Sequence, residues 1–226
     1  MRQHKIMLAG VAFVPHISGA LYAPDHRTLL VADLHLEQGA SLARRGLNVP
    51  PFDTLATLAV LAAVIAETRP QRLVLLGDSF HDRVAHIELP EPARHRIETI
   101  TASLDTIWIS GNHDPVAPRE LGGQCVASLE IAGITLRHEP SRARAMSFEI
   151  AGHLHPGASI VQRGISTRAK CFIADDRRII MPAFGSYTGA LGVQSNAFYG
   201  LFEADKTNVW MLRPKAIHRF PLRRVT

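Results

Sequence analysis

The stretch Gly111-Asn112-His113-Asp114 follows an apolar, β-branched run, Thr106-Ile107-Trp108-Ile109-Ser110. The run predicts a β-strand, and the four residues fall in the loop beyond its carboxyl end, where open α/β sheets place their ligand sites. The loop offers an amide oxygen for a metal, an imidazole that can donate a proton, and a carboxylate that can hold this imidazole by its other nitrogen. Because short motifs recur by chance, the weight of this one depends on the rest of the chain.

Two earlier strands end in the same way. The apolar run 28–32 leads into Asp33-Leu34-His35, and the run 72–76 leads into Gly77-Asp78. A helix is predicted from Asp53 or Thr54 to about Thr68, and another over 91–104, which gives the βαβ rhythm of a layered α/β domain. Asp33 and His35 can converge on one ion, although a strand that simply ends in polar loop residues is the alternative. Asp78 can bridge two cations through its two carboxylate oxygens.

The second half of the chain predicts more strands and fewer helices. A hairpin over 128–131 and 133–137 leads to His138, and a strand over 148–151 leads to Gly152-His153-Leu154-His155. Further strands are predicted at 169–174, 178–181, 198–203 and 207–212. Residues 213–226 form a basic C-terminal tail, which either contacts nucleic acid or is simply solvated.

Composition limits the class of protein. With 226 residues, 46% of them apolar, the chain predicts a single domain over 1–226. The absence of a run of about 18 apolar residues argues against a membrane span. Cys125 and Cys171 lie far apart without a CxxC motif, which favours a reduced, cytoplasmic protein. The formal net charge of +5 permits a polyanionic partner without requiring one.

In chain order the blocks read D-x-H, G-D, G-N-H-D, H and G-H-x-H, and this combination resembles the calcineurin-like metallophosphoesterase superfamily. The resemblance implies a layered α/β fold, with two central β-sheets flanked by helices in an αββα sandwich. It also implies two divalent metal ions, with Mn²⁺ favoured and Fe or Zn²⁺ as alternatives. By similarity, the first metal takes Asp33, His35, Asp78 and His155, and the second takes Asp78, Asn112, His138 and His153. His113 faces the phosphate as a catalytic residue outside both ligand sets, and Asp114 supports it.

This arrangement suits the hydrolysis of an anionic diester. Two cations about 3.5–4 Å apart neutralise the phosphodiester and lower the pKa of a water held between them. His113 then stabilises charge or protonates the leaving oxygen.

Three segments resemble one branch of the superfamily more closely, the ligase-associated DNA damage response endonucleases. They are Asp33–Glu37, Gly77–Asp82 and Pro182–Ala190. The branch implies DNA as substrate and association with a DNA ligase, a helicase and an exonuclease of a repair system. His81 then either positions the DNA backbone or only orients Asp78. Arg44 either meets phosphate or is solvated on a helix face, and Tyr187 is a candidate for lining the substrate groove.

The leading hypothesis is therefore a DNA repair endonuclease with two metal ions. A small-molecule phosphoesterase acting on a nucleotide, cyclic nucleotide or phosphoester metabolite is the first alternative. A metal-bearing, non-catalytic subunit that binds DNA is the second. A homodimer is compatible with each.

Overall fold

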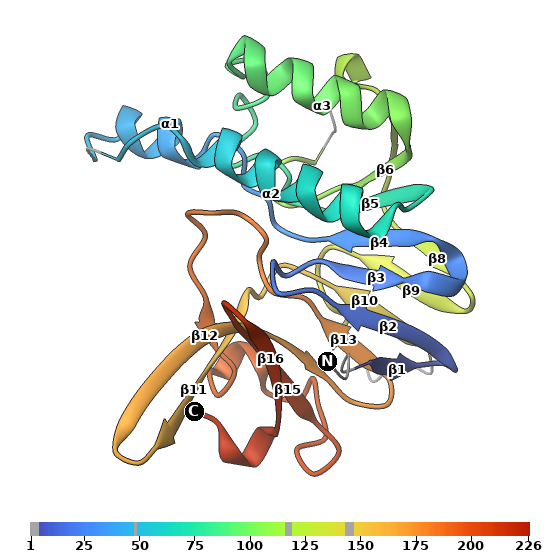
Figure 1. Ribbon diagram of the computed structural model, residues 1–226, viewed down its shortest axis with the longest axis vertical. Helices are drawn as coiled ribbons and strands as arrows, with labels where there is room; N and C mark the ends of the chain where they lie inside the picture. The colour runs from blue at the N-terminus through green and yellow to red at the C-terminus, as the bar shows by residue number, and fades with distance from the viewer. Residues whose placement is uncertain (1–4, 48, 116–118, 143–146) are drawn as a thin grey trace.

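The computed structural model describes residues 5–47, 49–115, 119–142 and 147–226. Two β-sheets pack face to face, and the α-helices lie together over the outer face of the first sheet (Figure 1). This confirms the predicted layered α/β fold. The first sheet has the order β1-β2-β3-β4-β5-β6-β7, with bounds Ile6–Leu8, Val11–Pro15, Leu21–Ala23, Thr28–Val31, Arg72–Leu76, Asp105–Ile109 and Gln124–Val126.

The second sheet runs β14-β11-β12-β13-β10-β9-β8, and β15 pairs with both β12 and β16. In chain order, β8 to β16 span Leu129–Ile131, Ile134–Arg137, Phe148–Ala151, Pro156–Gln162, Ile165–Ala174, Arg178–Ile180, Leu191–Gly192, Asn208–Arg213 and Ala216–Pro221. The α-helices are α1 (Gln38–Arg44), α2 (Asp53–Thr68) and α3 (Glu91–Ser103). Short 3₁₀ turns lie at Pro24–His26, Arg119–Leu121, Asn196–Phe198 and Leu222–Arg224.

The strands β4, β5 and β6 are parallel neighbours, as the sequence predicts. The crossovers between them carry α2 and α3, so all three strands end at one edge of the sheet. The predicted hairpin is also confirmed, with β8 antiparallel to β9 and β9 parallel to β10. This places the loops after β9 and β10 in the second sheet.

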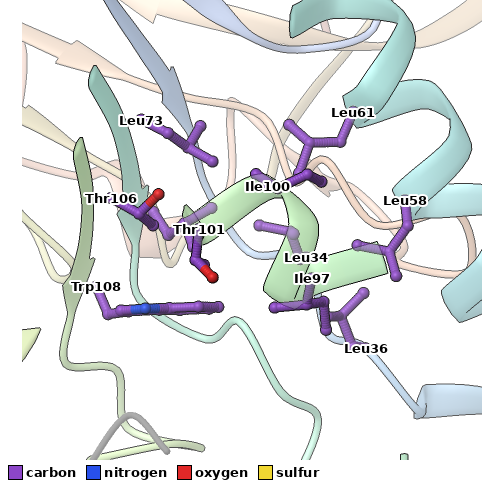
Figure 2. A pocket seen from close by; sticks show the side chains of 11 residues that line it. Leu34, Leu36, Leu58, Leu61, Leu73, Ile97, Ile100, Thr101, Thr106 and Trp108 are labelled. Carbon is purple, nitrogen blue, oxygen red and sulfur yellow. The ribbon is translucent and has the colours of Figure 1, made fainter. Parts of the chain in front are cut away.

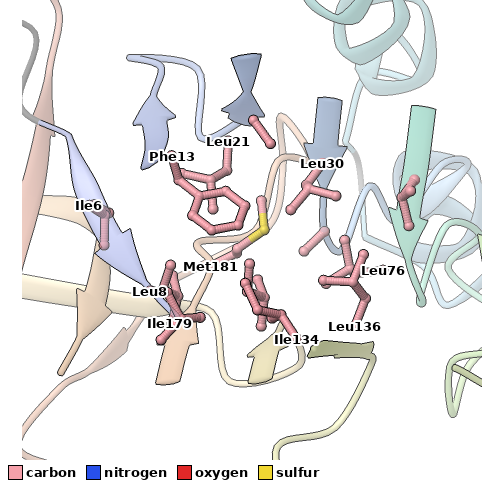
Figure 3. Close-up of a cluster of buried hydrophobic side chains, with 14 of the residues drawn as sticks. Ile6, Leu8, Phe13, Leu21, Leu30, Leu76, Ile134, Leu136, Ile179 and Met181 are labelled. Atoms are coloured by element: carbon pink, nitrogen blue, oxygen red, sulfur yellow. The ribbon is translucent and has the colours of Figure 1, made fainter. Parts of the chain in front are cut away.

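Apolar side chains from both sheets form the central core (Figure 3). Leu8, Phe13 and Leu30 from the first sheet meet Leu136 and Ile179 from the second, and all five are less than 5% exposed. Neighbouring residues on a strand face opposite sides of the sheet, so every second side chain of these strands points into the central core. The other face of β4, β5 and β6 packs against α2 and α3.

The packing under the helices is nearly complete. A cavity of about 10 Å³ lies between Leu34, Leu58, Leu61, Ile97 and Trp108, which come from α2, α3, β6 and the loop after β4 (Figure 2). This volume is about that of a single water probe, and its lining is almost entirely apolar. No described helix is long and apolar enough to cross a membrane.

The outer face of the second sheet differs from the expected sandwich. Among the described residues no α-helix covers it. Instead, Val193, Phe198 and Leu201 pack there against β12, β13 and β15. The strand predicted over 198–203 is wrong, because this segment begins in a 3₁₀ turn and continues without strand pairing. The strand β11, which pairs with β12 in a long hairpin, is not anticipated by the sequence.

The segment 213–226, predicted as a basic tail, contains a strand and a 3₁₀ turn. Residues 216–221 form β16, which pairs antiparallel with β15. Arg219 lies over the ring of Trp210, 5.3 Å from its centroid. Thr226 exchanges backbone hydrogen bonds with Ser159 on β11.

A buried ion pair supports the loop that carries His138. The Arg178 Nε lies 2.5 Å from Glu149 Oε1, across the parallel strands β13 and β10. The same guanidinium donates to the carbonyl oxygen of Ser141, and the carboxylate of Glu149 accepts the N–H of Ser141. The pair therefore holds Ser141, three residues beyond His138, by both of its backbone polar groups.

We expect Arg178→Met to destabilise the fold by about 3–5 kcal/mol, because it leaves the Glu149 carboxylate buried without its partner. Urea unfolding followed by circular dichroism measures this loss. Arg177→Met is the matched control, since Arg177 is an exposed neighbour on the same segment. Equal unfolding midpoints for the two variants would contradict the assigned role of the pair.

Candidate metal centre

Five loops meet at one edge of the molecule. Three follow β4, β5 and β6 of the first sheet, and two follow β9 and β10 of the second. Backbone hydrogen bonds join the first two loops: the Asp33 N–H donates to the Gly77 carbonyl and the His35 N–H to the Asp78 carbonyl. From the second sheet, the His153 N–H donates to the carboxylate of Asp33 at 3.0 Å. The Asn112 loop is joined to these loops by the His113 N–H, which donates to Asp78 Oδ1, and the His138 loop by the His138 carbonyl oxygen, which accepts the N–H of Gly152.

The backbone of this edge is unusual. Five of the seven predicted metal ligands have φ between 44° and 68°, the left-handed region that non-glycine residues rarely adopt: Asp33, His35, Asp78, His153 and His155. Such conformations persist only where surrounding contacts impose them, and they gather at functional sites.

A first group of possible ligands comprises Asp33, His35 and His155. The Nε2 atoms of the two histidines are 3.4 Å apart, and His155 Nε2 lies 3.3 Å from Asp33 Oδ1. Asp33 is fully buried and His35 is 5% exposed.

A second group comprises Asp78, His138 and His153. His138 Nε2 lies 3.3 Å from Asp78 Oδ2, 3.1 Å from His153 Nδ1 and 2.9 Å from the side-chain oxygen of Asn112. Asp78 Oδ2 is also 3.9 Å from His35 Nε2, so this carboxylate lies between the two groups. The structure therefore brings all seven predicted ligands together, grouped as the family resemblance implies. Their role as ligands stays a prediction.

These separations fit bound cations. Ligand atoms that share one ion at about 2.0–2.2 Å lie about 3.0–3.5 Å apart, close to the 2.9–3.4 Å found within the two groups. The Nδ1–H of His138 donates to the carbonyl oxygen of Leu76 at 3.0 Å, which leaves Nε2 for a metal. A mixed set of imidazole, carboxylate and amide ligands suits divalent metal ions.

The surroundings of His138 favour its protonated form. Burial disfavours the charged form of His138, but its hydrogen bond to Asp78 and the charge of Asp33 outweigh burial and raise its pKa to about 9. Burial likewise opposes the charge on Asp78, yet the hydrogen bond with His138 lowers the pKa of this carboxyl to about 2. At pH 7 the two form an ion pair where a cation would bind.

Metal binding at pH 7 is therefore expected to release about one proton, because the metal needs the Nε2 lone pair that the imidazolium lacks. Metal affinity should fall as the pH decreases from about 9, since below that value His138 is protonated in the free protein. Calorimetric titration with Mn²⁺ in two buffers of different ionisation enthalpy measures the released proton. A binding enthalpy that is independent of the buffer would contradict this prediction.

His113 stands outside both groups. Its Nδ1–H donates to the carbonyl oxygen of His81 at 2.6 Å, so Nε2 is the nitrogen that remains available. Nε2 lies 4.0 Å from Asp78 Oδ2, and 39% of the side chain is exposed. The backbone N–H of His113 donates to Asp78 Oδ1 at 2.9 Å. The imidazole is thus fixed beside the centre with one nitrogen accessible from outside.

Asp114 does not support His113 as predicted. Its Oδ2 accepts the N–H groups of Ser79 and Phe80, at 2.7 and 3.2 Å, and the partner of the imidazole is the carbonyl of His81 instead. Burial, with the nearby charge of Asp78, raises the pKa of Asp114 to about 7 against the effect of these hydrogen bonds. Asp114 therefore shapes the loop that carries Asp78.

Gly111 packs too tightly against this loop to accept a side chain. A Cβ there would lie 2.2 Å from the backbone nitrogen of Asp78 and 2.2 Å from its Oδ1. We expect Gly111→Ala to displace Asp78 and to weaken metal binding by about 10–100-fold, the effect typical of losing a ligand's support. A Mn²⁺ titration measures this. Gly189→Ala is the control, because no atom lies within 4 Å of its Cβ position; equal affinities would show that the loop tolerates the methyl group.

The three predicted substrate-binding residues differ in their surroundings. The ring of His81 lies 5.5 Å, centroid to centroid, from both His35 and His113, so it borders the centre. Arg44 forms ion pairs with Asp82 and Glu88, which offset the charge that a phosphate contact would use. The hydroxyl of Tyr187 donates to the carbonyl oxygen of Pro50, which ties the loop 182–190 to the segment before α2.

Sequence reasoning missed Lys170 on β12. Its ammonium donates to the carbonyl oxygens of Ala183 and Gly185, both at 2.8 Å, and the N–H of Gly185 donates to the carbonyl oxygen of Asp33. Burial lowers the pKa of this lysine to about 8, while the charge of Asp33 opposes the shift. A lysine beside the apolar run 171–174 was the available signal, because a charge at such a position needs partners.

The fold and the grouping of aspartate and histidine side chains at this edge support a metal-dependent phosphoesterase. The chain is similar to the nuclease MPE of Pseudomonas putida, with a TM-score of 0.72 and 27% identity over 96% of this chain and 99% of that one. The phosphoesterase Yfce from E. coli aligns at a TM-score of 0.44 and 14% identity, covering 86% and 98% of the two chains. No family model and no curated protein sequence matches the chain.

Proposed function

We propose that this protein is a metal-dependent phosphodiesterase that cleaves DNA, with Mn²⁺ as its native metal. One observation carries the proposal: two groups of possible metal ligands, joined by Asp78, lie beside an imidazole that belongs to neither group. A purely structural metal site would have no use for His113 at this position.

Each residue then has a defined task. Asp33, His35, Asp78 and His155 would hold one metal, and Asp78, Asn112, His138 and His153 would hold the other. When bound there, two divalent ions would neutralise the phosphodiester and would supply a nucleophile from water. The Nε2 of His113, when protonated, donates to the phosphate or to the departing oxygen. The carbonyl of His81 fixes the imidazole in the required orientation.

The exposure of the site favours a large substrate. His113 and His155 have side chains 39% and 22% exposed, so the centre opens to the surface. The formal net charge of +5 supports binding of a polyanion. The similarity to a protein named as a nuclease extends over nearly the whole chain and points in the same direction.

The branch resemblance extends this proposal to endonuclease action in DNA repair. It includes association with a DNA ligase, a helicase and an exonuclease in the cytoplasm. A homodimer is compatible with these roles.

The decisive experiment compares an aryl phosphodiester with the matching phosphomonoester, in Mn²⁺ and in chelator. We expect turnover of the diester in Mn²⁺ and none in chelator, followed by nicking of supercoiled plasmid and cleavage of single-stranded DNA. Preference for the monoester would instead indicate a small-molecule phosphoesterase. Bound metal without turnover of either substrate would indicate a binding subunit.

A further inference from the structure

A third group of possible ligands borders the two already described. His35, His81 and His113 each place one ring nitrogen within 4.8 Å of the others. Their ring centroids are 5.0 to 5.5 Å apart. The three histidines come from the loops after β4, β5 and β6, so the parallel strands themselves bring them together.

Each of the three rings has a nitrogen that the protein does not use. His113 commits Nδ1 to the carbonyl of His81 and leaves Nε2 without a hydrogen bond. The Nδ1 atoms of His35 and His81 are buried without a hydrogen-bond partner. Buried polar nitrogens without partners are rare, and each calls for a ligand or another physical reason.

The position of His81 is well fixed. Its N–H donates to the carbonyl oxygen of Leu36, where the two loops form an isolated parallel bridge between Leu36 and Phe80. The backbone that carries His81 is therefore held against the loop that carries His35.

We propose that these three histidines form a third, inhibitory cation site that is selective for Zn²⁺ over Mn²⁺. Three imidazoles suit zinc, whereas Mn²⁺ prefers oxygen ligands. Tetrahedral zinc places its nitrogen ligands about 3.4 Å apart, so the rings must close by about 1 Å or more. His81 is half-buried, and 39% of the His113 side chain is exposed.

Inhibition follows from the identity of the ligands and rests on the proposed function. A zinc ion held by His113 occupies the nitrogen that would face the phosphate. The carboxylate of Asp78, 3.9 Å from His35 Nε2 and 4.0 Å from His113 Nε2, offsets the charge of the added cation. Excess zinc should therefore compete with substrate, while excess Mn²⁺ should not.

The test counts zinc in the full chain. After dialysis against micromolar Zn²⁺, elemental analysis should find one zinc ion more per chain in the native protein than in His81→Asn. His95→Asn, at an exposed position on α3, should keep the native zinc content. Equal zinc contents in the native protein and in His81→Asn would overturn the proposal.

A second readout uses the diester substrate. Adding Zn²⁺ to the Mn²⁺-loaded native protein should lower turnover at least tenfold, and His81→Asn should lose this sensitivity relative to its own zinc-free rate. Equal sensitivity in the two proteins would overturn the inhibitory role. If no protein turns over the diester, the proposed function fails, while the zinc count still decides whether the third site exists.

Discussion

Asp78→Asn is expected to leave a folded protein that binds at most one metal ion and that hydrolyses a phosphodiester about 10³-fold more slowly. The loss reflects several kcal/mol of charge stabilisation that two ions supply together. Asp78 is the carboxylate between the two groups of ligands, and asparagine keeps its shape without its charge. The side-chain oxygen of asparagine can still accept the N–H of His113, so the loop should keep its conformation.

The measurements are metal content by elemental analysis and turnover of the aryl diester. Asp82→Asn is the matched control, because it removes a carboxylate four residues away that pairs with Arg44. The control should bind two ions and keep its turnover. If Asp78→Asn also binds two ions and turns over normally, Asp78 does not join the two groups.

The second large effect is expected from His113→Ala. Diester turnover should fall by about 10²–10⁴-fold, the usual contribution of a positioned acid or base. Metal content should stay unchanged, because the backbone N–H that contacts Asp78 remains. The variant therefore separates a residue that acts on the substrate from one that binds metal.

Elemental analysis and diester kinetics again serve as the two measurements, with His95→Ala as control. His95 is an exposed histidine on α3, away from the sheet edge. Loss of metal in His113→Ala would show that this imidazole is a ligand. Unchanged turnover would remove it from the mechanism and would favour a binding subunit.

Local sequence patterns predicted the part of the fold that carries the centre. The apolar runs before Asp33, Asp78 and Gly111 are buried strands, and parallel strands with helical crossovers bring their ends to one edge. The hairpin before His138 could also be predicted, because a glycine-containing turn joins its two strands. Where apolar periodicity and position in the sheet decide the structure, a single sequence is enough to predict that part of the fold.

Other features depend on long-range contacts that a local pattern does not encode. The strand β11 contains Pro156 and Gly157, which are residues typical of loops. Its strand conformation depends on pairing with β12, a contact that the local sequence does not show. The basic segment that contains Arg219 reads as solvated, yet it extends the sheet at β15. Similarly, the adjacent positions of His113 and Asp114 suggest that their side chains interact. In the structure, Asp114 accepts the N–H of Ser79, whereas the His113 ring donates to the carbonyl oxygen of His81.

The left-handed backbone conformation at the metal centre affects which amino-acid substitutions this protein can accept. An L-residue in that conformation costs roughly 1–2 kcal/mol, and five of the predicted ligands adopt it. Glycine or asparagine would relieve the cost at His153 or His155 but would remove an imidazole. Selection for stability and selection for activity thus favour different residues at the same positions. Libraries screened only for thermostability should therefore accumulate inactive variants at this edge first.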